Sequence, residues 1–301
     1  MAYHKRTLEE LDIIDNFLMD QLVLDETFGE DFCRRILSSL LQREIRGKLQ
    51  VRAQKSLPAA APNLRGIRMD VEIEELDGVP DEQGAAVMNI YDLEPHLRDD
   101  LNLPKHNRFY QAKIDSRGLR SGERDFTKLP NLYILTILNY DPFGRDYMMY
   151  TIRNQCEELP DLKYEDRLRF CYFYTGGKKG GNERLRTLLT YIQDSRTENA
   201  TDAATKELHD YVSRAKILPE VKQAYMTFED FIYYERKDAA KEAAIENKKN
   251  DILELLEDYG NIPESLKERL QETDDPGVLK KWHKLAAKAN SIKEFAEKIS
   301  G

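Results

Sequence analysis

Apolar residues recur at two different spacings along the chain, and each spacing predicts a different kind of element. A recurrence of about 3.6 residues predicts amphipathic helices over Thr7–Leu24, where Thr7 and Glu10 form a capping box, and over Glu30–Leu41. Strict alternation in Ile67–Leu76 predicts a half-buried strand that carries Asp70 on its polar face. The chain therefore begins with helices and continues into a sheet.

The next segments alternate between strands and a helix. Asp77-Gly78 and Gln83-Gly84 supply turn residues, which make Ala86–Glu94 the antiparallel partner of the acidic strand. Pro95 lacks a backbone donor and is expected to end that partner strand at Glu94. The remaining predictions are strands over Lys48–Ala53, Leu132–Asn139, Met148–Arg153 and Leu168–Tyr174, a loop over Ser56–Asn63, and a helix over Pro104–Ser116.

A glycine-rich stretch, Thr175–Gly181, separates this pattern from a helical remainder. Helices are predicted over Asn182–Gln193, Asp202–Ile217 and Thr227–Lys249, with two or three shorter helices within Asp251–Ile299. The predicted fold class is α/β. Its core has the order helix, three strands, helix, strand and covers residues 1–175, and a mostly helical region covers residues 176–301.

The composition narrows the class of protein. Among 301 residues, 41% are hydrophobic, and no apolar run approaches the roughly 20 residues that span a bilayer. The start of the chain is charged rather than signal-like, and three widely spaced cysteines form no disulfide framework. We therefore expect a globular protein of the cytoplasm without a membrane partner.

The net charge of −9 hides an uneven distribution. Residues 34–68 hold nine basic residues and one acid, residues 70–100 hold eleven acids and one base, and residues 105–128 hold seven bases and three acids. Such blocks are commonly solvated faces. An acidic centre between basic arms is also typical of a metal-dependent phosphodiesterase, in which acids bind the cation and bases bind the polyanion.

Carboxylates from the two paired strands can converge on one divalent cation. Asp70 lies on the first strand, and Asp92 and Glu94 share a face of the second. Mg²⁺ or Mn²⁺ bound by such carboxylates keeps water ligands and open positions for phosphate oxygens. His96 follows two residues after Glu94, and Lys105 begins the next predicted helix. A soluble surface hairpin is the alternative interpretation of the same acids.

The order of several segments is more specific than this spacing. Gly66–Val71, Val87–His96 and Leu103–Asp115, followed by Leu129–Ile137 and Asp141–Gly144, resemble the PD-(D/E)XK nuclease family transposases, also called the recombination-promoting nuclease group. The resemblance covers roughly residues 12–235. It implies a restriction-endonuclease-like core and metal-dependent endonucleolytic cleavage of DNA in bacterial recombination.

The resemblance also assigns roles to individual residues. Asp70 matches the first metal-binding aspartate and Glu94 the acid of the (D/E)-x-K element, while Asp92 is either a third ligand or a neighbour. His96 stands where the superfamily has lysine. A neutral imidazole can act as a base or as a metal ligand, and Lys105 can supply the missing cation instead. An acid from the first helix, Asp15 or Asp20, can join the site.

The other predicted contacts are with nucleic acid. Arg108 is expected to bind phosphate or Glu94, and Arg68 and Arg98 to contact DNA. Tyr110 is expected to pack on the sheet with its hydroxyl outward, where it can contact nucleic acid, whereas His106 is left as a surface or core residue. The expected function is Mg²⁺- or Mn²⁺-dependent DNA endonuclease. The alternatives are a catalytically degenerate DNA-binding or self-assembly module that forms a homodimer through its helical region, and an enzyme of the same fold that acts on RNA.

Overall fold

The computed structural model describes residues 6–57, 67–76, 88–99, 102–119, 122 and 124–300. The chain divides into two compact units, of which the first ends at Gln223 and the second begins at Ala224. The predicted boundary at residue 175 lies inside the first unit. The turns at Asp77-Gly78 and Gln83-Gly84, and most of the loop over Ser56–Asn63, lie outside the described residues.

A mixed sheet forms the centre of the first unit. Its six strands within the described ranges have the order β1-β2-β3-β4-β6-β5. The pairs β1/β2, β2/β3 and β5/β6 are antiparallel, whereas β3, β4 and β6 run parallel to one another. The strands are β1 Lys48–Leu57, β2 Ile67–Leu76, β3 Asn89–His96, β4 Asn131–Leu138, β5 Met149–Ile152 and β6 Leu168–Tyr174.

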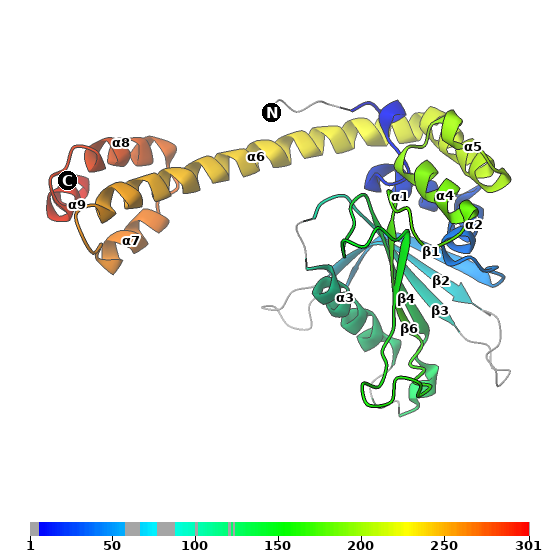
Figure 1. Cartoon of the computed structure of the whole chain (residues 1–301). Helices are drawn as coiled ribbons and strands as arrows, with labels where there is room; N and C mark the ends of the chain where they lie inside the picture. The colour runs from blue at the N-terminus through cyan, green and yellow to red at the C-terminus, as the bar shows by residue number, and fades with distance from the viewer. Residues whose placement is uncertain are drawn as a thin grey trace. The chain divides into compact units, whose positions relative to one another are not determined.

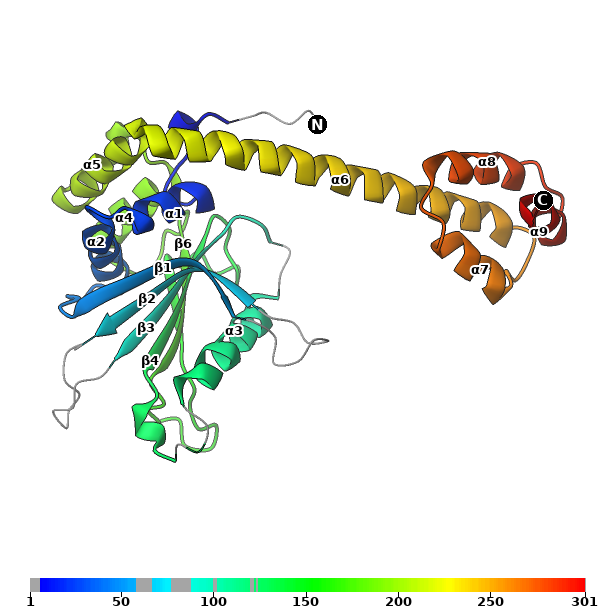
Figure 2. The same ribbon diagram turned by 180° about the vertical axis from the view of Figure 1, so that it is seen from behind.

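Helices cover both faces of this sheet, and Figures 1 and 2 show α3 on one face and α1, α2, α4 and α5 on the other. Under α3, Ile90, Ile114, Leu132 and Ile134 form a buried apolar cluster. The fold is therefore α/β, as the alternating pattern predicted. The helices are α1 Asn16–Leu24, α2 Gly29–Leu41, α3 Leu103–Gly118, α4 Glu183–Gln193 and α5 Ala203–Ile217.

The predicted first helix, Thr7–Leu24, is wrong in its first half. The capping box that starts at Thr7 is present, but it caps only the single 3₁₀ turn Leu8–Glu10, and α1 begins later. Between the two, the backbone N–H of Ile14 donates to the carbonyl of Ile192 at 3.1 Å, next to the end of α4. This tertiary hydrogen bond replaces an intrahelical one, because local propensity is weaker than packing.

The predicted end of a strand at Pro95 is also wrong. β3 continues through Pro95 to His96, and Pro95 pairs with Ile137 in the parallel ladder with β4. The pairing of β3 with β2 ends earlier, at Leu93. Pro95 therefore lies beyond the region in which β3 is paired on both edges, and its missing donor is tolerated there. As a result, His96 stays on the strand.

The second unit is helical. α6, Pro219–Glu257, begins at the end of the first unit and extends the predicted helix Thr227–Lys249 on both sides. Trp282 and Phe295 belong to the apolar core of this unit. Among the described residues, no helix is long and apolar enough to cross a membrane. The remaining helices are α7 Glu264–Gln271, α8 Pro276–Ala286 and α9 Ile292–Ser300.

Candidate functional site

The three predicted metal-binding acids share one face of the β2–β3 hairpin. Glu72 pairs with Asp92 and Val71 with Leu93, so one further step of the same register places Asp70 opposite Glu94. Directly opposed residues of antiparallel strands point to the same face, and so do residues two apart on one strand. Asp70, Asp92 and Glu94 therefore point to the face that α3 covers.

Two of these acids are buried, and three of their four carboxyl oxygens accept no hydrogen bond among the described residues. Asp92 is 0% exposed and Glu94 is 3% exposed. Both carboxyl oxygens of Asp92, and Oε1 of Glu94, accept no hydrogen bond from any residue that the structure describes. The neighbouring acid Glu72 differs, because it is equally buried but bonds to the guanidinium groups of Arg52 and Arg117. Both oxygens of Asp92 and one oxygen of Glu94 thus lack the hydrogen-bond partners that buried carboxylates normally have.

The same environment makes the acids harder to ionise. Burial raises the pKa of Asp92 well above its usual range, and the charge of Asp70 raises it further. Burial also raises the pKa of Glu94, and the charges of Asp92 and Asp70 add to this effect. The three carboxyls are therefore close enough to repel one another. A divalent cation among them would relieve both the repulsion and the missing hydrogen bonds.

The first helix reaches this site through an amide and not through its first acid. Asn16 Nδ2 donates to Asp70 Oδ2 at 3.0 Å. Asp15 instead pairs with Arg6 at 2.7 Å, and it occupies the N-cap position of α1 without a side-chain hydrogen bond to the helix. Asp20 is buried one helical turn after Asn16, on the same side of α1. Of the two acids that the sequence left open, Asp20 is the one on the side of α1 that approaches Asp70.

Two histidines complete the group around Glu94. His96 Nε2 and His106 Nδ1 each lie 4.0 Å from Glu94 Oε2. The two imidazole rings meet edge to face with centroids 5.4 Å apart, and the His106 ring packs on Tyr110 at 4.1 Å. Tyr110 also packs directly against the apolar cluster between α3 and the sheet.

Three of the predicted basic residues form no ion pair with the acids of this site. Lys105, Arg108 and Arg98 are exposed, and none forms an ion pair with an acid that the structure describes. Lys105 and Arg108 are on α3, and Arg98 follows β3. The side chain of Arg68 lies outside the described part of the chain. Lys105, Arg108 and Arg98 therefore form no ion pair with Asp70, Asp92 or Glu94.

Sequence reasoning did not find Asn16, His106 or Asn107. The helical spacing contains the signal for the last two, because residues that are three, four or seven apart lie on one side of a helix. Leu103, Asn107 and Ile114 are the buried positions of α3, and His106 lies within that stripe. No such signal marks Asn16, because its contact with Asp70 joins residues 54 positions apart.

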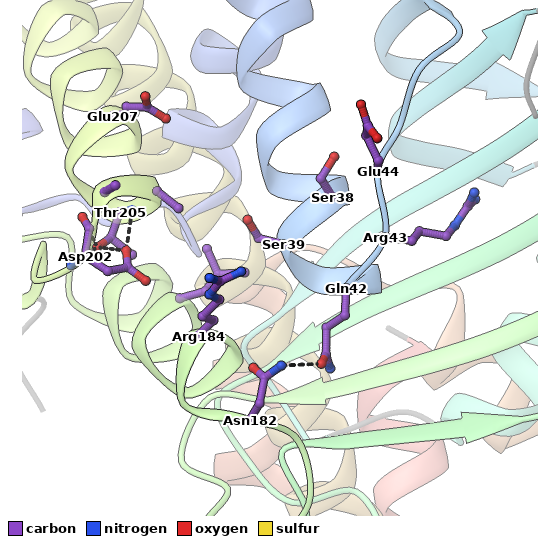
Figure 3. Close-up of a pocket in the computed structure, with 13 residues that line it drawn as sticks. Ser38, Ser39, Gln42, Arg43, Glu44, Asn182, Arg184, Asp202, Thr205 and Glu207 are labelled. Atoms are coloured by element: carbon purple, nitrogen blue, oxygen red, sulfur yellow. Dashed lines mark hydrogen bonds between the residues drawn. The ribbon is translucent and has the colours of Figure 1, made fainter.

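A separate hollow on the surface contains none of these acids. Figure 3 shows its polar lining, which includes Arg43 and Arg184, and its volume is about 760 Å³. Asn182 donates to Gln42 across it at 2.7 Å. Arg43 also bonds to Tyr91, which occupies an odd-numbered position of β3 and so lies on the face opposite the acids. The hollow and the acid cluster are therefore distinct.

The acids and histidines offer oxygen and nitrogen ligands at one place, in a buried setting that strengthens binding to a cation. No protein-family model, curated protein or solved structure matches the chain.

Proposed function

We propose that the protein is a metal-dependent nuclease that hydrolyses DNA phosphodiester bonds on a restriction-endonuclease-like core. The observation that carries the proposal is the carboxyl of Asp92, which is buried, lacks hydrogen-bond donors among the described residues and lies on the same face as Asp70 and Glu94. The order α1, β1–β3, α3, β4 is the one that the resemblance implies, which supports the fold assignment.

The donor set suits a divalent cation. Asp70, Asp92 and Glu94 would hold the ion, which when bound acts as a Lewis acid toward a phosphate oxygen and lowers the pKa of water. Asn16 orients the carboxylate of Asp70. His96 lies beside Glu94 in the position of the superfamily lysine, where its imidazole, when it is not itself bound to a metal, can accept a proton from water.

The substrate is proposed from the surface charges. Lys105, Arg108 and Arg98 are exposed on elements that adjoin the acidic face, so they can contact a phosphate backbone without first breaking an internal ion pair. Contacts with the phosphate backbone do not distinguish one base sequence from another. We therefore expect cleavage that depends only weakly on DNA sequence.

Plasmid cleavage tests this function. Purified protein should nick or linearise supercoiled DNA with Mg²⁺ or Mn²⁺, and Asp70→Asn or Glu94→Gln should abolish the activity. Asp161→Asn, at an exposed position elsewhere in the unit, is the matched control and should cleave like the parent. Failure to cleave with any divalent metal, or cleavage that persists in both site variants, overturns the proposal. Preferential cleavage of RNA in the same assay reassigns the substrate.

A further inference from the structure

The carboxylate of Glu94 faces two imidazoles as well as two acids. One ligand atom each from Glu94, His96 and His106 can be chosen so that all three lie within 4.8 Å of one another. His96 comes from the end of β3 and His106 from the first half of α3, so two rigid elements fix the group. Precise metal sites are usually built on such elements rather than on loops.

The three side chains are near the spacing that a metal requires. In a four-coordinate site with bonds of about 2.0–2.1 Å, ligand atoms lie about 3.3 Å apart. Both imidazole nitrogens are 4.0 Å from Glu94 Oε2. Side-chain rotations that close the largest separation by roughly 1.5 Å therefore suffice to bring all three atoms to bonding distance.

A hydrogen-bond chain orients His106. Asn107 is 0% exposed, and its Nδ2 donates to Thr136 Oγ1 on β4 at 3.1 Å. This leaves Asn107 Oδ1, which can only accept, 3.1 Å from His106 Nδ1. This contact fixes the orientation of the His106 ring beside Glu94. Metal-binding histidines are commonly held by a partner of this kind.

The burial of Glu94 supplies a second reason to expect a cation. Its Oε1 accepts no hydrogen bond among the described residues, although the residue is only 3% exposed to solvent. The hydroxyl or amide donors that would otherwise stabilise a buried carboxylate are absent from that oxygen. A cation bound by the neighbouring imidazoles would satisfy it.

We propose that Glu94, His96 and His106 form a binding site for a first-row transition-metal ion, and that this site prefers Zn²⁺ to Mg²⁺. Imidazole suits Zn²⁺ and its neighbours, whereas Mg²⁺ prefers oxygen ligands and keeps its water. A carboxylate with two histidines, and with positions left open, is a donor set of catalytic metal sites. The inference rests on the proposed function only for the use of this metal in hydrolysis, because Glu94 is shared with the acid cluster.

Metal titration of the full chain without DNA tests the site. Metal-free protein is titrated with Zn²⁺ and with Mg²⁺ by calorimetry, and Co²⁺ is used as a visible-absorption probe of nitrogen ligation. The variants are His96→Gln and His106→Gln, and His283→Gln in the second unit is the matched control. Because the two site variants change different elements, a folding defect in one, seen by circular dichroism, leaves the other as a test.

The parent should bind Zn²⁺ at least tenfold more tightly than Mg²⁺. Each site variant should weaken Zn²⁺ binding by roughly 10–100-fold or more and change the Co²⁺ spectrum, while the control does neither. Equal Zn²⁺ affinity in parent and site variants overturns the inference. If that happens while DNA cleavage still requires Asp70 and Glu94, the nuclease proposal stands. If Zn²⁺ binding depends on the histidines but no divalent metal supports DNA cleavage, the nuclease proposal is rejected and the zinc-site inference stands.

Discussion

Replacement of Asp92 by asparagine should remove activity and stabilise the metal-free protein. The substitution Asp92→Asn keeps the shape of the side chain but removes an ionisable group that is fully buried and lacks donors among the described residues. It also removes one of three carboxyls that repel one another. A side chain kept for metal binding is expected to destabilise the fold in this way.

The magnitude follows from the burial of Asp92. An ionised carboxylate in such a place costs several kcal/mol, whereas an amide without a partner costs about 1–3 kcal/mol. We therefore expect the variant to gain about 1–3 kcal/mol in free energy of unfolding. In a unit of this size each kcal/mol moves Tm by about 2–4 °C, so the expected rise is about 2–12 °C.

The gain should depend on pH. The pKa of Asp92 is raised in the folded state. The stability that its protonation provides is complete below the unfolded-state pKa of about 3.9 and is lost as the pH rises through the raised folded-state pKa. The parent loses this stability over that range and the variant does not. The difference between them should therefore be near zero around pH 4 and largest at alkaline pH.

Thermal unfolding by circular dichroism in chelator, across this pH range, measures the difference. Asp99→Asn, at an exposed position after β3, is the matched control and should leave Tm unchanged. Added Mn²⁺ should stabilise the parent, by about 2.7 kcal/mol at a concentration 100 times Kd, and the variant much less. A variant that is no more stable than the parent at alkaline pH, while the control is normal, would refute the reasoning.

Three further predictions concern other parts of the molecule. Glu72→Gln should lower stability by about 3–5 kcal/mol in urea unfolding, because it breaks a buried ion pair with two arginines; a loss below about 1 kcal/mol argues against that pair. Phe295→Ala should destabilise the second unit by about 3–5 kcal/mol, which speeds its proteolysis while the proteolysis rate of the first unit stays unchanged. Asn16→Ala should weaken Mn²⁺ binding by about 10–100-fold in calorimetry through loss of its bond to Asp70; unchanged affinity removes Asn16 from the site.

The sequence predicted the sheet better than the ends of its helices. The bounds of the acidic strand, Ile67–Leu76, are confirmed without change, because its alternation of apolar and acidic residues is strict. The predicted half-buried setting is wrong, since neighbouring residues on opposite faces, Val71 and Glu72, are both 0% exposed. The first helix was predicted too long, since the periodicity of Thr7–Leu24 cannot show that Ile14 bonds to a residue 178 positions later. Tertiary hydrogen bonds of that kind leave no local pattern.

In the candidate site too, the sequence predicts what depends on strand alternation and misses what depends on tertiary packing. The facing of Asp92 and Glu94 follows from alternation along one strand, and their convergence with Asp70 follows from the hairpin register. The position of His106 beside Glu94 does not follow from the sequence pattern, because it depends on how α3 lies across the sheet and on the hydrogen bond from Asn107 to Thr136. Sequence spacing assigns a residue to a helix face, but only packing decides which residue that face meets.

The most direct test of the central claim is anomalous diffraction from crystals soaked with Mn²⁺. The claim is that Asp70, Asp92 and Glu94 together bind one cation. It predicts an anomalous peak within coordination distance of all three carboxyls. Ordered density for those side chains with no such peak, or a basic side chain lying among them, would contradict it.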